Sequence, residues 1–413
     1  MENNFKKEYT TLSKVEADIL AINKKNLLYK REDFDAIPRT DNRVMGIFGE
    51  RGVGKTTLLL QKRIETDNAF YFSADSAIIK SIGLYNFVMY CVFEMGIKTL
   101  FIDEIFRYDN RKQEIKNCID SFLETNFYFS GSSSMALYDG VIDLGRRIYV
   151  YQVHTLSFRE FLKLKYHIDL PKITFSDLLQ NHEKLSMKYS ISLKNKYFEE
   201  YLKMWAYPFG LNLNYNSFIN HLQNVLDRVI MEDLKYINSF ETQSLDRLSR
   251  LIYFISTSTP SELSVNQLSQ KIALNQAVVD NTLYLLNKIG AVHLVPKWEN
   301  LSQKVRKEYK ILLGDTNKYF VNNLEPEIGT IREAFFVSEI KKLNTHFNKL
   351  EISVPRQWDF KVEFLGKESY YFEVGGKNKK SDKYPKETFI IKDNIEISEN
   401  QKTIPLRLLG FLN

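Results

Sequence analysis

The sequence predicts an α/β fold on a parallel sheet, followed by a helical region and a small mixed α+β part. Three observations lead to this prediction. From Val44 to about Val153, short apolar runs alternate with segments of helix length. The first run leads into a glycine-rich loop at residues 49–57, and the third ends in two acidic residues. Strands that are apolar on both faces and separated by helices are typical of parallel sheets with crossover helices.

Each predicted element follows from such a pattern. The predicted strands are VMGIFG (44–49), AFYFSADS (69–76), TLFIDE (99–104), FYFSGSS (127–133) and RIYVYQV (147–153). A charged helical extension precedes them and breaks at Pro38. Helical periodicity dominates after the fifth strand, and mixed patterns return near the C-terminus. The predicted parts are residues 1–42, 43–155, 156–245, 246–300 and 301–413.

Composition and charge restrict the class of protein. The 413 residues carry a net charge of +6, which permits a phosphate-bearing partner without requiring one. The two cysteines, Cys91 and Cys118, lie in apolar helical segments, and we expect reduced, buried thiols. No clustered Cys/His pattern indicates zinc. The longest apolar stretch, residues 84–96, is too short to span a bilayer, and the N-terminus lacks a signal-peptide pattern. We therefore expect a cytoplasmic protein with no membrane partner.

The loop GERGVGKTT fits the pattern G-x-x-x-x-G-K-[ST], which holds nucleotide phosphates. Its glycines let successive backbone N–H groups point at a phosphate, and the following helix adds its positive dipole end. Lys55 supplies a cation to the β- and γ-phosphates, and the Thr56 hydroxyl is a ligand for Mg²⁺. The sequence therefore predicts ATP and Mg²⁺ as ligands. The predicted nucleotide-binding residues are Gly49, Glu50, Arg51, Gly52, Val53, Gly54, Lys55, Thr56 and Thr57.

Two acids at the end of the third predicted strand extend this site. Asp103 is expected to hold Mg²⁺ through water, and Glu104 to act as the catalytic base for the attacking water. Either acid alone also fits a solvated helix cap, but the pair at the carboxyl edge of a parallel strand favours catalysis.

Further candidates follow the fourth strand. Ser132 in SGSSS is the predicted sensor of the γ-phosphate, although a polar loop or N-cap explains it equally well. Arg146 and Arg147 precede the fifth strand, and one of them is a candidate for reaching a γ-phosphate in the same or a neighbouring subunit. A surface arginine is an equally good interpretation.

Residues 264–295 show a helix–turn–helix rhythm followed by the strand-like run AVHLV, which is typical of a winged helix. Such a unit places its second helix in a DNA major groove. Here the polar residues of that helix are mostly uncharged or acidic, and Lys288 is its only cation. Since phosphate contacts supply most DNA affinity, we favour a packing or interaction role.

The chain resembles bacterial and archaeal predicted AAA-superfamily ATPases that carry a C-terminal domain of unknown function related to PD-(D/E)xK nucleases. The resemblance rests on GERGVGKTTLL, LFIDEI, FSGSSSMAL, LSFREFL, GTIREAFF, FEVGGKNK and IPLRLLGFL, in this order along the chain. It implies an ATPase domain of the additional-strand type, a winged-helix segment and a small α+β nuclease-like domain.

In such nucleases a helix carboxylate, a strand Asp and an E-x-K motif surround Mg²⁺. The matching residues here would be Glu333, Asp359 and Glu373. The position two after Glu373 is a glycine, and the first lysine is Lys377, so the sequence predicts a degenerate site. A basic run follows, which indicates either a nucleic-acid contact or a solvated loop; it comprises Lys377, Lys379, Lys380, Lys383 and Lys386.

We therefore predict a Mg²⁺-dependent ATPase that acts as a nucleotide-driven switch, with a winged-helix and a degenerate nuclease-like domain. Two alternatives stay open. One is an ATP-regulated nuclease acting on DNA or RNA, and the other is a non-catalytic nucleotide-binding scaffold or DNA-binding regulator. A protein partner or self-association is expected in either case, but the sequence does not identify it.

Overall fold

The computed structural model describes residues 2–37, 43–108, 111–132, 148–234, 242–260, 263–297, 308–322, 325–343, 350–364, 368–379 and 387–413. The chain forms two compact units. The N-terminal unit ends at His154, and the C-terminal unit begins at Thr155.

The N-terminal unit is built on a five-stranded sheet in which every pairing is parallel. Its order is β2-β3-β4-β1-β5, so β4 lies between the two strands that lead into the predicted site. This confirms the predicted parallel sheet. The strands are β1 (Val44–Gly49), β2 (Ala69–Ser73), β3 (Thr99–Asp103), β4 (Asn126–Gly131) and β5 (Tyr149–Val153).

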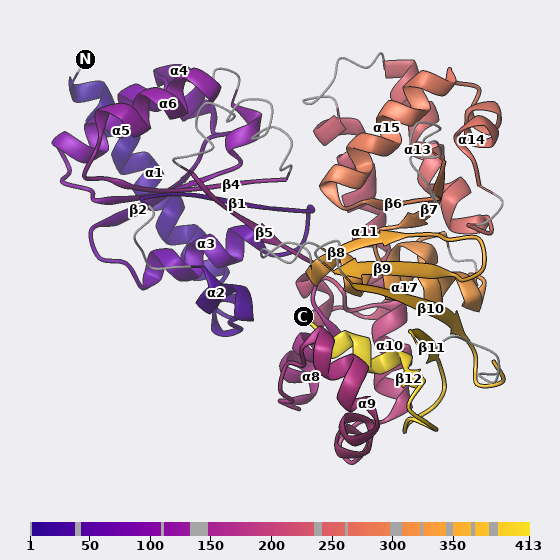
Figure 1. The fold of residues 1–413 in the computed structure, drawn as a ribbon. Helices are drawn as coiled ribbons and strands as arrows, with labels where there is room; N and C mark the ends of the chain where they lie inside the picture. Colours follow the sequence, from indigo (N-terminus) through magenta and orange to yellow (C-terminus); the bar gives the residue numbers. More distant parts are fainter. Residues whose placement is uncertain are drawn as a thin grey trace. The chain divides into compact units, whose positions relative to one another are not determined.

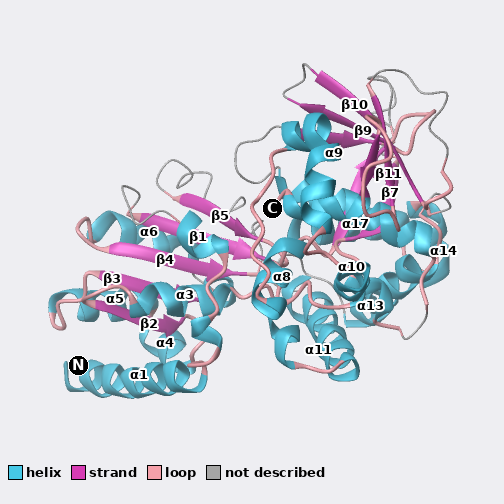
Figure 2. Ribbon diagram, turned by 90° about the horizontal axis from the view of Figure 1, so that it is seen from below, coloured by secondary structure: helices cyan, strands magenta, loops and turns pink. Residues whose placement is uncertain are grey.

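Helices cover both faces of this sheet (Figures 1 and 2). One hydrophobic core contains apolar residues of α4, α5 and α6 together with residues of the strands. The helix α3 also contacts the strands. The edge strand β2 is protected by α1, because the Glu16 carboxylate accepts the Tyr71 N–H at 2.9 Å. The helices are α1 (Glu2–Ile22), α2 (Glu32–Ala36), α3 (Lys55–Ile64), α4 (Ala77–Ile82), α5 (Leu84–Phe93) and α6 (Arg111–Ser121).

The C-terminal unit begins with helices. Capping boxes at Ser157 and Thr174 start the first two of them, as their hydroxyls accept backbone N–H groups three residues on. A five-residue π-helix, Val229–Asp233, follows the fourth. These helices are α8 (Phe158–Tyr166), α9 (Phe175–Ser190), α10 (Asn195–Lys203) and α11 (Tyr215–Arg228).

Three helices and a hairpin come next: α13 (Thr242–Thr257), α14 (Val265–Ile272), α15 (Gln276–Ile289), β6 (Val292–Pro296) and β7 (Tyr309–Leu313). The helices and the strand lie where the helix–turn–helix pattern predicted them. The predicted boundary of this part is residue 300. In the structure β7 pairs antiparallel with β6, so the hairpin extends to Leu313.

A second five-stranded sheet, of order β12-β11-β10-β9-β8, forms the last part of the chain. β8, β9 and β10 are antiparallel neighbours, whereas β11 and β12 run parallel to β10. The helix α17 (Ile328–Leu343) packs on it, and Phe336 stacks on Phe360. The strands are β8 (Leu350–Ser353), β9 (Phe360–Phe364), β10 (Glu368–Gly375), β11 (Thr388–Lys392) and β12 (Thr403–Pro405).

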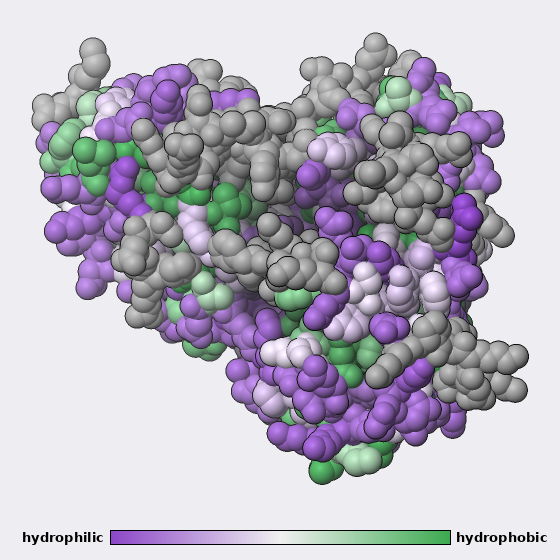
Figure 3. Space-filling model, viewed as in Figure 1, coloured by the Kyte–Doolittle hydropathy of each residue, from purple (hydrophilic) through white to green (hydrophobic). Residues whose placement is uncertain are grey.

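On the face drawn in Figure 3, the described surface is mostly hydrophilic with smaller hydrophobic groups. Within the described ranges, every helix is too short or too polar to cross a membrane. Cys91 and Cys118 are both buried thiols in the N-terminal core, as expected.

Candidate functional site

The glycine-rich loop connects β1 to α3. Gly52 and Gly54 have φ angles of 87° and 98°, in the left-handed region that glycine adopts without strain. A Cβ on Gly49 would lie 2.1 Å from the Val153 carbonyl oxygen, so the loop packs tightly on β5. No side chain caps α3 at Gly54, which suits a phosphate at this helix N-terminus. Of the other predicted residues, Glu50, Arg51 and Val53 lie in the loop and Thr57 in the first turn of α3.

Lys55 is buried and bends back over the loop. Its Nζ donates to the carbonyl oxygens of Gly49 and Glu50, both at 2.9 Å. The ammonium is therefore held against the loop backbone, where phosphate oxygens bound by the loop would reach it.

Asp103, at the end of β3, is surrounded by hydroxyl groups. Thr56 donates to its Oδ2 at 2.7 Å and Tyr71 to the same oxygen at 2.9 Å, while Ser130 donates to Oδ1. Burial, and then the negative charge of Asp103, raise the pKa of the Tyr71 phenol, which therefore stays a donor. The adjacent oxygens of Thr56 and Asp103 fit Mg²⁺, which prefers oxygen ligands.

Glu104 follows with a left-handed backbone, at φ 52°, which is uncommon outside glycine. Its Oε2 lies 3.5 Å from the Arg107 Nε, and Arg107 also contacts Asp75 at 3.3 Å. Burial, followed by the charge of Asp103, raises the pKa of the Glu104 carboxyl. Lys55, Arg107 and Arg51 act in the opposite direction. The side chain is thus a partly buried carboxylate next to the phosphate loop, as a general base requires.

Sequence reasoning missed two of the three hydroxyls around Asp103. Ser132, the predicted γ-phosphate sensor, directly follows β4, and a different serine, Ser130, contacts Asp103. The signal lies in the sheet register. Ile102 pairs with Phe129, so the next residues along the two strands are Asp103 and Ser130. Tyr71 lies on the other neighbour, β2. Arg146 and Arg147 lie outside the described residues.

A second group of charges lies at β9 and β10. Asp359, immediately before β9, accepts the Val374 N–H at 2.8 Å and the Lys379 Nζ at 3.0 Å. The same Nζ lies 2.5 Å from Glu373 Oε2. Burial alone would lower the pKa of Lys379, but Glu373 and Asp359 outweigh it and the net shift is upward. The ammonium thus bridges two of the predicted nuclease-like carboxylates.

The bridging lysine is Lys379, two residues beyond the predicted Lys377. β10 ends at Gly375, and the Lys379 N–H donates to the Gly376 carbonyl at 3.0 Å, which closes a turn. A Cβ on Gly375 would lie 2.4 Å from Lys379 Cδ, so the lysine stem fills the space above this glycine. Because β10 ends at Gly375, Lys379 rather than Lys377 reaches the two carboxylates. Lys380, Lys383 and Lys386 lie outside the described residues.

Glu333, on α17, pairs with Lys310 of β7 at 2.7 Å. Burial raises the pKa of the Glu333 carboxyl, Lys310 opposes this shift, and Asp359 adds to it. The charges of the three predicted carboxylates therefore influence one another. Glu333 pairs with Lys310, whereas Asp359 and Glu373 share Lys379. Across the described ranges, no three His, Cys, Asp or Glu side chains are arranged to hold a metal ion.

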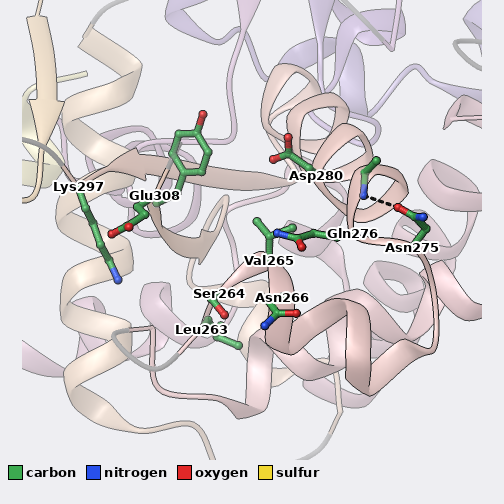
Figure 4. Close-up of a pocket in the computed structure, with 11 residues that line it drawn as sticks. Leu263, Ser264, Val265, Asn266, Asn275, Gln276, Asp280, Lys297 and Glu308 are labelled. Atoms are coloured by element: carbon green, nitrogen blue, oxygen red, sulfur yellow. Dashed lines mark hydrogen bonds between the residues drawn. The ribbon is translucent and has the colours of Figure 1, made fainter. Parts of the chain in front are cut away.

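The C-terminal unit also has a hollow of about 700 Å³ between the starts of α14 and α15 and the loop end of the β6–β7 hairpin (Figure 4). Its charged lining is Asp280, Glu308 and Lys297, and the other lining residues are uncharged. Gln276 extends from α15 into this space. Two acids against one base make this face a poor partner for a phosphate backbone.

Comparisons with known proteins agree with the first of these sites. Residues 41–162 match a family described as an AAA domain, and residues 196–317 match a domain of unknown function, DUF8612. The chain is 25% identical over 318 residues to the "Uncharacterized protein MJ1637" of Methanocaldococcus jannaschii. That alignment covers 71% of this chain and 66% of the relative, just under two thirds of its length.

Solved structures with some similarity include DnaA of Aquifex aeolicus bound to AMPPCP, at 14% identity and a TM-score of 0.28, covering 61% of this chain and 84% of that one. The S. cerevisiae Hsp104–ADP complex has 15% identity and a TM-score of 0.26, and the match covers 64% of this chain and 39% of that one. C. elegans PCH-2 has 12% identity and a TM-score of 0.24, and the match covers 68% of this chain and 72% of that one. TM-scores this low establish no shared overall fold. The match to an AAA domain thus falls on the unit that carries the parallel sheet and the phosphate loop.

Proposed function

We propose that the N-terminal unit binds ATP with Mg²⁺ and hydrolyses it, and that the nucleotide state switches the arrangement of the later domains. The observation that carries this proposal is the meeting of Thr56, Asp103 and Glu104 beside Lys55 at the carboxyl edge of the sheet. The chain has one such phosphate loop and no helicase motif that we recognise, which favours a switch over continuous translocation.

Each group has a distinct role in this mechanism. The loop amides and Lys55 bind the phosphates, and Lys55 exchanges its bonds to Gly49 and Glu50 for phosphate oxygens. Thr56 and Asp103 would hold Mg²⁺, which neutralises phosphate charge when bound. Glu104 orients the attacking water and accepts its proton. Ser132 and either Arg146 or Arg147 are our proposed contacts to the γ-phosphate.

Steady-state ATP hydrolysis with Mg²⁺ tests the proposal. Lys55→Ala and Glu104→Gln should each reduce turnover by about 100-fold or more, because they remove charge stabilisation and the base. Lys116→Ala and Glu124→Gln change the same residue types at exposed sites of the same unit and should leave turnover unchanged. Wild-type ATP binding without turnover would contradict the enzyme and favour a nucleotide-binding scaffold.

The switch has its own test. Small-angle scattering of the full chain with and without a non-hydrolysable ATP analogue should differ. Identical curves under saturating analogue would contradict the switch without affecting the ATPase assignment.

An ATP-regulated nuclease is the second candidate, and one observation favours it. The Lys379 ammonium lies within 3.0 Å of both Asp359 and Glu373, although the E-x-K position itself is glycine. We propose that the resting site is closed, because this lysine lies between the carboxylates that would bind a metal. Mg²⁺-dependent cleavage of DNA or RNA that requires ATP and is lost in Asp359→Ala would establish this second activity.

Nucleic acid also remains a proposed ligand apart from cleavage. Stimulation of ATP hydrolysis by DNA or RNA, with a steep salt dependence, would support that role. Its absence would favour a protein partner or self-association, in agreement with the acidic lining of the hollow beside α15.

A further inference from the structure

Arg31, just before α2, joins two segments that are far apart in sequence. Its Nη1 donates to the Val53 carbonyl in the phosphate loop and to the His154 carbonyl after β5, both at 2.9 Å. The guanidinium is planar and rigid, and one nitrogen serves both carbonyls. A displacement of Val53 therefore moves the guanidinium, and with it His154, or breaks one of the bonds.

The orientation of this guanidinium is fixed by a second pair of contacts. The Asp33 Oδ2 lies 3.0 Å from Arg31 Nη2, and the Tyr151 hydroxyl donates to Asp33 Oδ1 at 2.7 Å. Tyr151 belongs to β5, the strand that ends at Val153, directly before His154. The Arg31–Asp33 pair is therefore bonded to this strand as well. Both charged side chains are largely buried, at 11% and 14% exposure, which strengthens the pair relative to a surface pair.

The segment that carries Arg31 is anchored to α3, the helix of the phosphate loop. Phe34 is buried, and the Lys62 Nζ lies 4.2 Å from its ring centroid and donates to the Ile37 carbonyl at 3.2 Å. Gln61 donates to the Leu27 and Tyr29 carbonyls. The segment that carries Arg31 is thus held in place on α3.

His154 is the last residue of the N-terminal unit at this crossing of the chain. Two residues on, Leu156 is held inside the C-terminal unit, since its N–H donates to the Ala206 carbonyl at 2.7 Å and its carbonyl accepts from Tyr201 at 2.6 Å. Only Thr155 separates the residue held by Arg31 from the residue held by the second unit. A rotation at His154 is therefore passed on through a very short linker.

We infer that Arg31 is a positioning residue that transmits nucleotide binding at the phosphate loop to the chain entering the C-terminal unit. This inference rests on the proposed binding of ATP to the loop. Phosphate binding redirects the loop backbone around Val53, and Arg31 converts that change into a movement of His154. The residue is not needed for the chemistry itself.

The test measures the distance between the units with fluorescence energy transfer in the full chain. Leu123→Cys and Ile191→Cys provide label sites, because these side chains are 70% and 86% exposed. The two native cysteines are buried and their pKa values are raised by burial, so they label poorly. ATP or a non-hydrolysable analogue should change the transfer efficiency, and Arg31→Gln should reduce that change at least about fivefold, as expected for losing a charge-assisted contact.

Nucleotide affinity is measured in parallel and separates the possible results. Affinity within about threefold of wild type, with the transfer change lost, supports the inference, since a defect confined to the loop would lower affinity instead. Arg31→Lys keeps the charge but not the shared contact and should behave like Arg31→Gln. Arg63→Gln breaks another ion pair of the same unit, with Glu16, and should keep the change.

Two results would overturn the inference. One is a full transfer change in Arg31→Gln, and the other is a loss of ATP binding in both Arg31 variants at unchanged melting temperature, which would make Arg31 a loop-folding residue only. If the wild type itself fails to bind ATP, the proposed function fails first. If the wild type binds ATP with no transfer change, only the coupling fails.

Discussion

Asp103 is the last residue of β3 and Asp359 immediately precedes β9, yet the partners of the two aspartates differ in charge. Asp103 accepts hydrogen bonds from three hydroxyls, those of Thr56, Tyr71 and Ser130. Asp359 shares the ammonium of Lys379 with Glu373. Hydroxyls orient a carboxylate without cancelling its charge, whereas an ammonium neutralises it.

This difference indicates what each site needs before it can bind a cation. At Asp103 a metal has only to displace neutral donors, and Thr56 can turn its oxygen from the carboxylate to the ion. Between Asp359 and Glu373 a metal must first displace a cation held by two carboxylates. We therefore propose that the N-terminal site is ready for a ligand, and that the C-terminal cluster binds a metal only after Lys379 has moved.

The largest effect is expected where the charge is needed for the ligand. Asp103→Asn removes the carboxylate that would face Mg²⁺, and we expect kcat for ATP to fall by about 100-fold or more. The Mg²⁺ concentration for half-maximal activity should rise as well. Asp67→Asn, an exposed site in the same unit, is the matched control. An unchanged Mg²⁺ dependence would show that Asp103 is not next to the metal.

The opposite expectation applies to the second cluster, where charge mainly supports the fold. Lys379→Met leaves Asp359 and Glu373 without their shared cation and should lower the free energy of unfolding by about 2 kcal/mol. Denaturant unfolding measures this effect. Lys361→Met, which breaks the more exposed pair with Glu363 on β9, should cost about 0.5 kcal/mol or less.

A double-mutant cycle sharpens that result. Glu373→Gln combined with Lys379→Met should lose less stability than the sum of the two single changes, because the second change removes a charge left unpaired by the first. A stable Lys379→Met protein would mean that the ammonium does not close the cluster, and the two aspartate sites would be more alike than we propose.

How far the sequence predicted these sites depends on how local each contact is. The strands, the phosphate loop and the pair Asp103–Glu104 follow from local patterns of apolar and glycine residues. Ser130 and Tyr71 do not, because their approach to Asp103 depends on which strands are neighbours in the sheet and in which register. A serine on β4 could be recognised only once β4 was known to lie beside β3.

The contacts of Lys379 and Arg31 could not be predicted, for related reasons. Lys379 reaches the carboxylates because the chain turns at Gly376, whereas the first lysine after Glu373 in the sequence is Lys377. The contacts of Arg31 join residues 22 and 123 positions away, a relation that no local pattern encodes.

The pH profile tests the environment of Glu104. A general base must be deprotonated, and its raised pKa means that ATP turnover should fall as the pH is lowered through a value above that of an ordinary glutamate. Arg107 lowers this pKa, so Arg107→Gln should move the acidic limb of kcat to higher pH. Activity well above the limb should change much less. If the acidic limb of the kcat profile does not move, Arg107 does not influence the pKa of Glu104.

The smallest expected effect concerns the hydroxyls themselves. Tyr71→Phe removes one of two donors to Asp103 Oδ2, while Thr56 keeps the other. A lost hydrogen bond of about 1 kcal/mol corresponds to about a fivefold change, and we expect it in the Mg²⁺ concentration for half-maximal activity rather than in stability.

Tyr128→Phe is the control for this change, since Tyr128 belongs to the same sheet and stacks on Phe101 without bonding Asp103. If Tyr71→Phe alters the Mg²⁺ dependence and Tyr128→Phe does not, the phenol orients the metal-facing carboxylate. If Tyr71→Phe lowers the melting temperature and leaves the Mg²⁺ dependence unchanged, the hydroxyl supports packing only. In that case the contrast with Asp359 would rest on Thr56 and Ser130 alone.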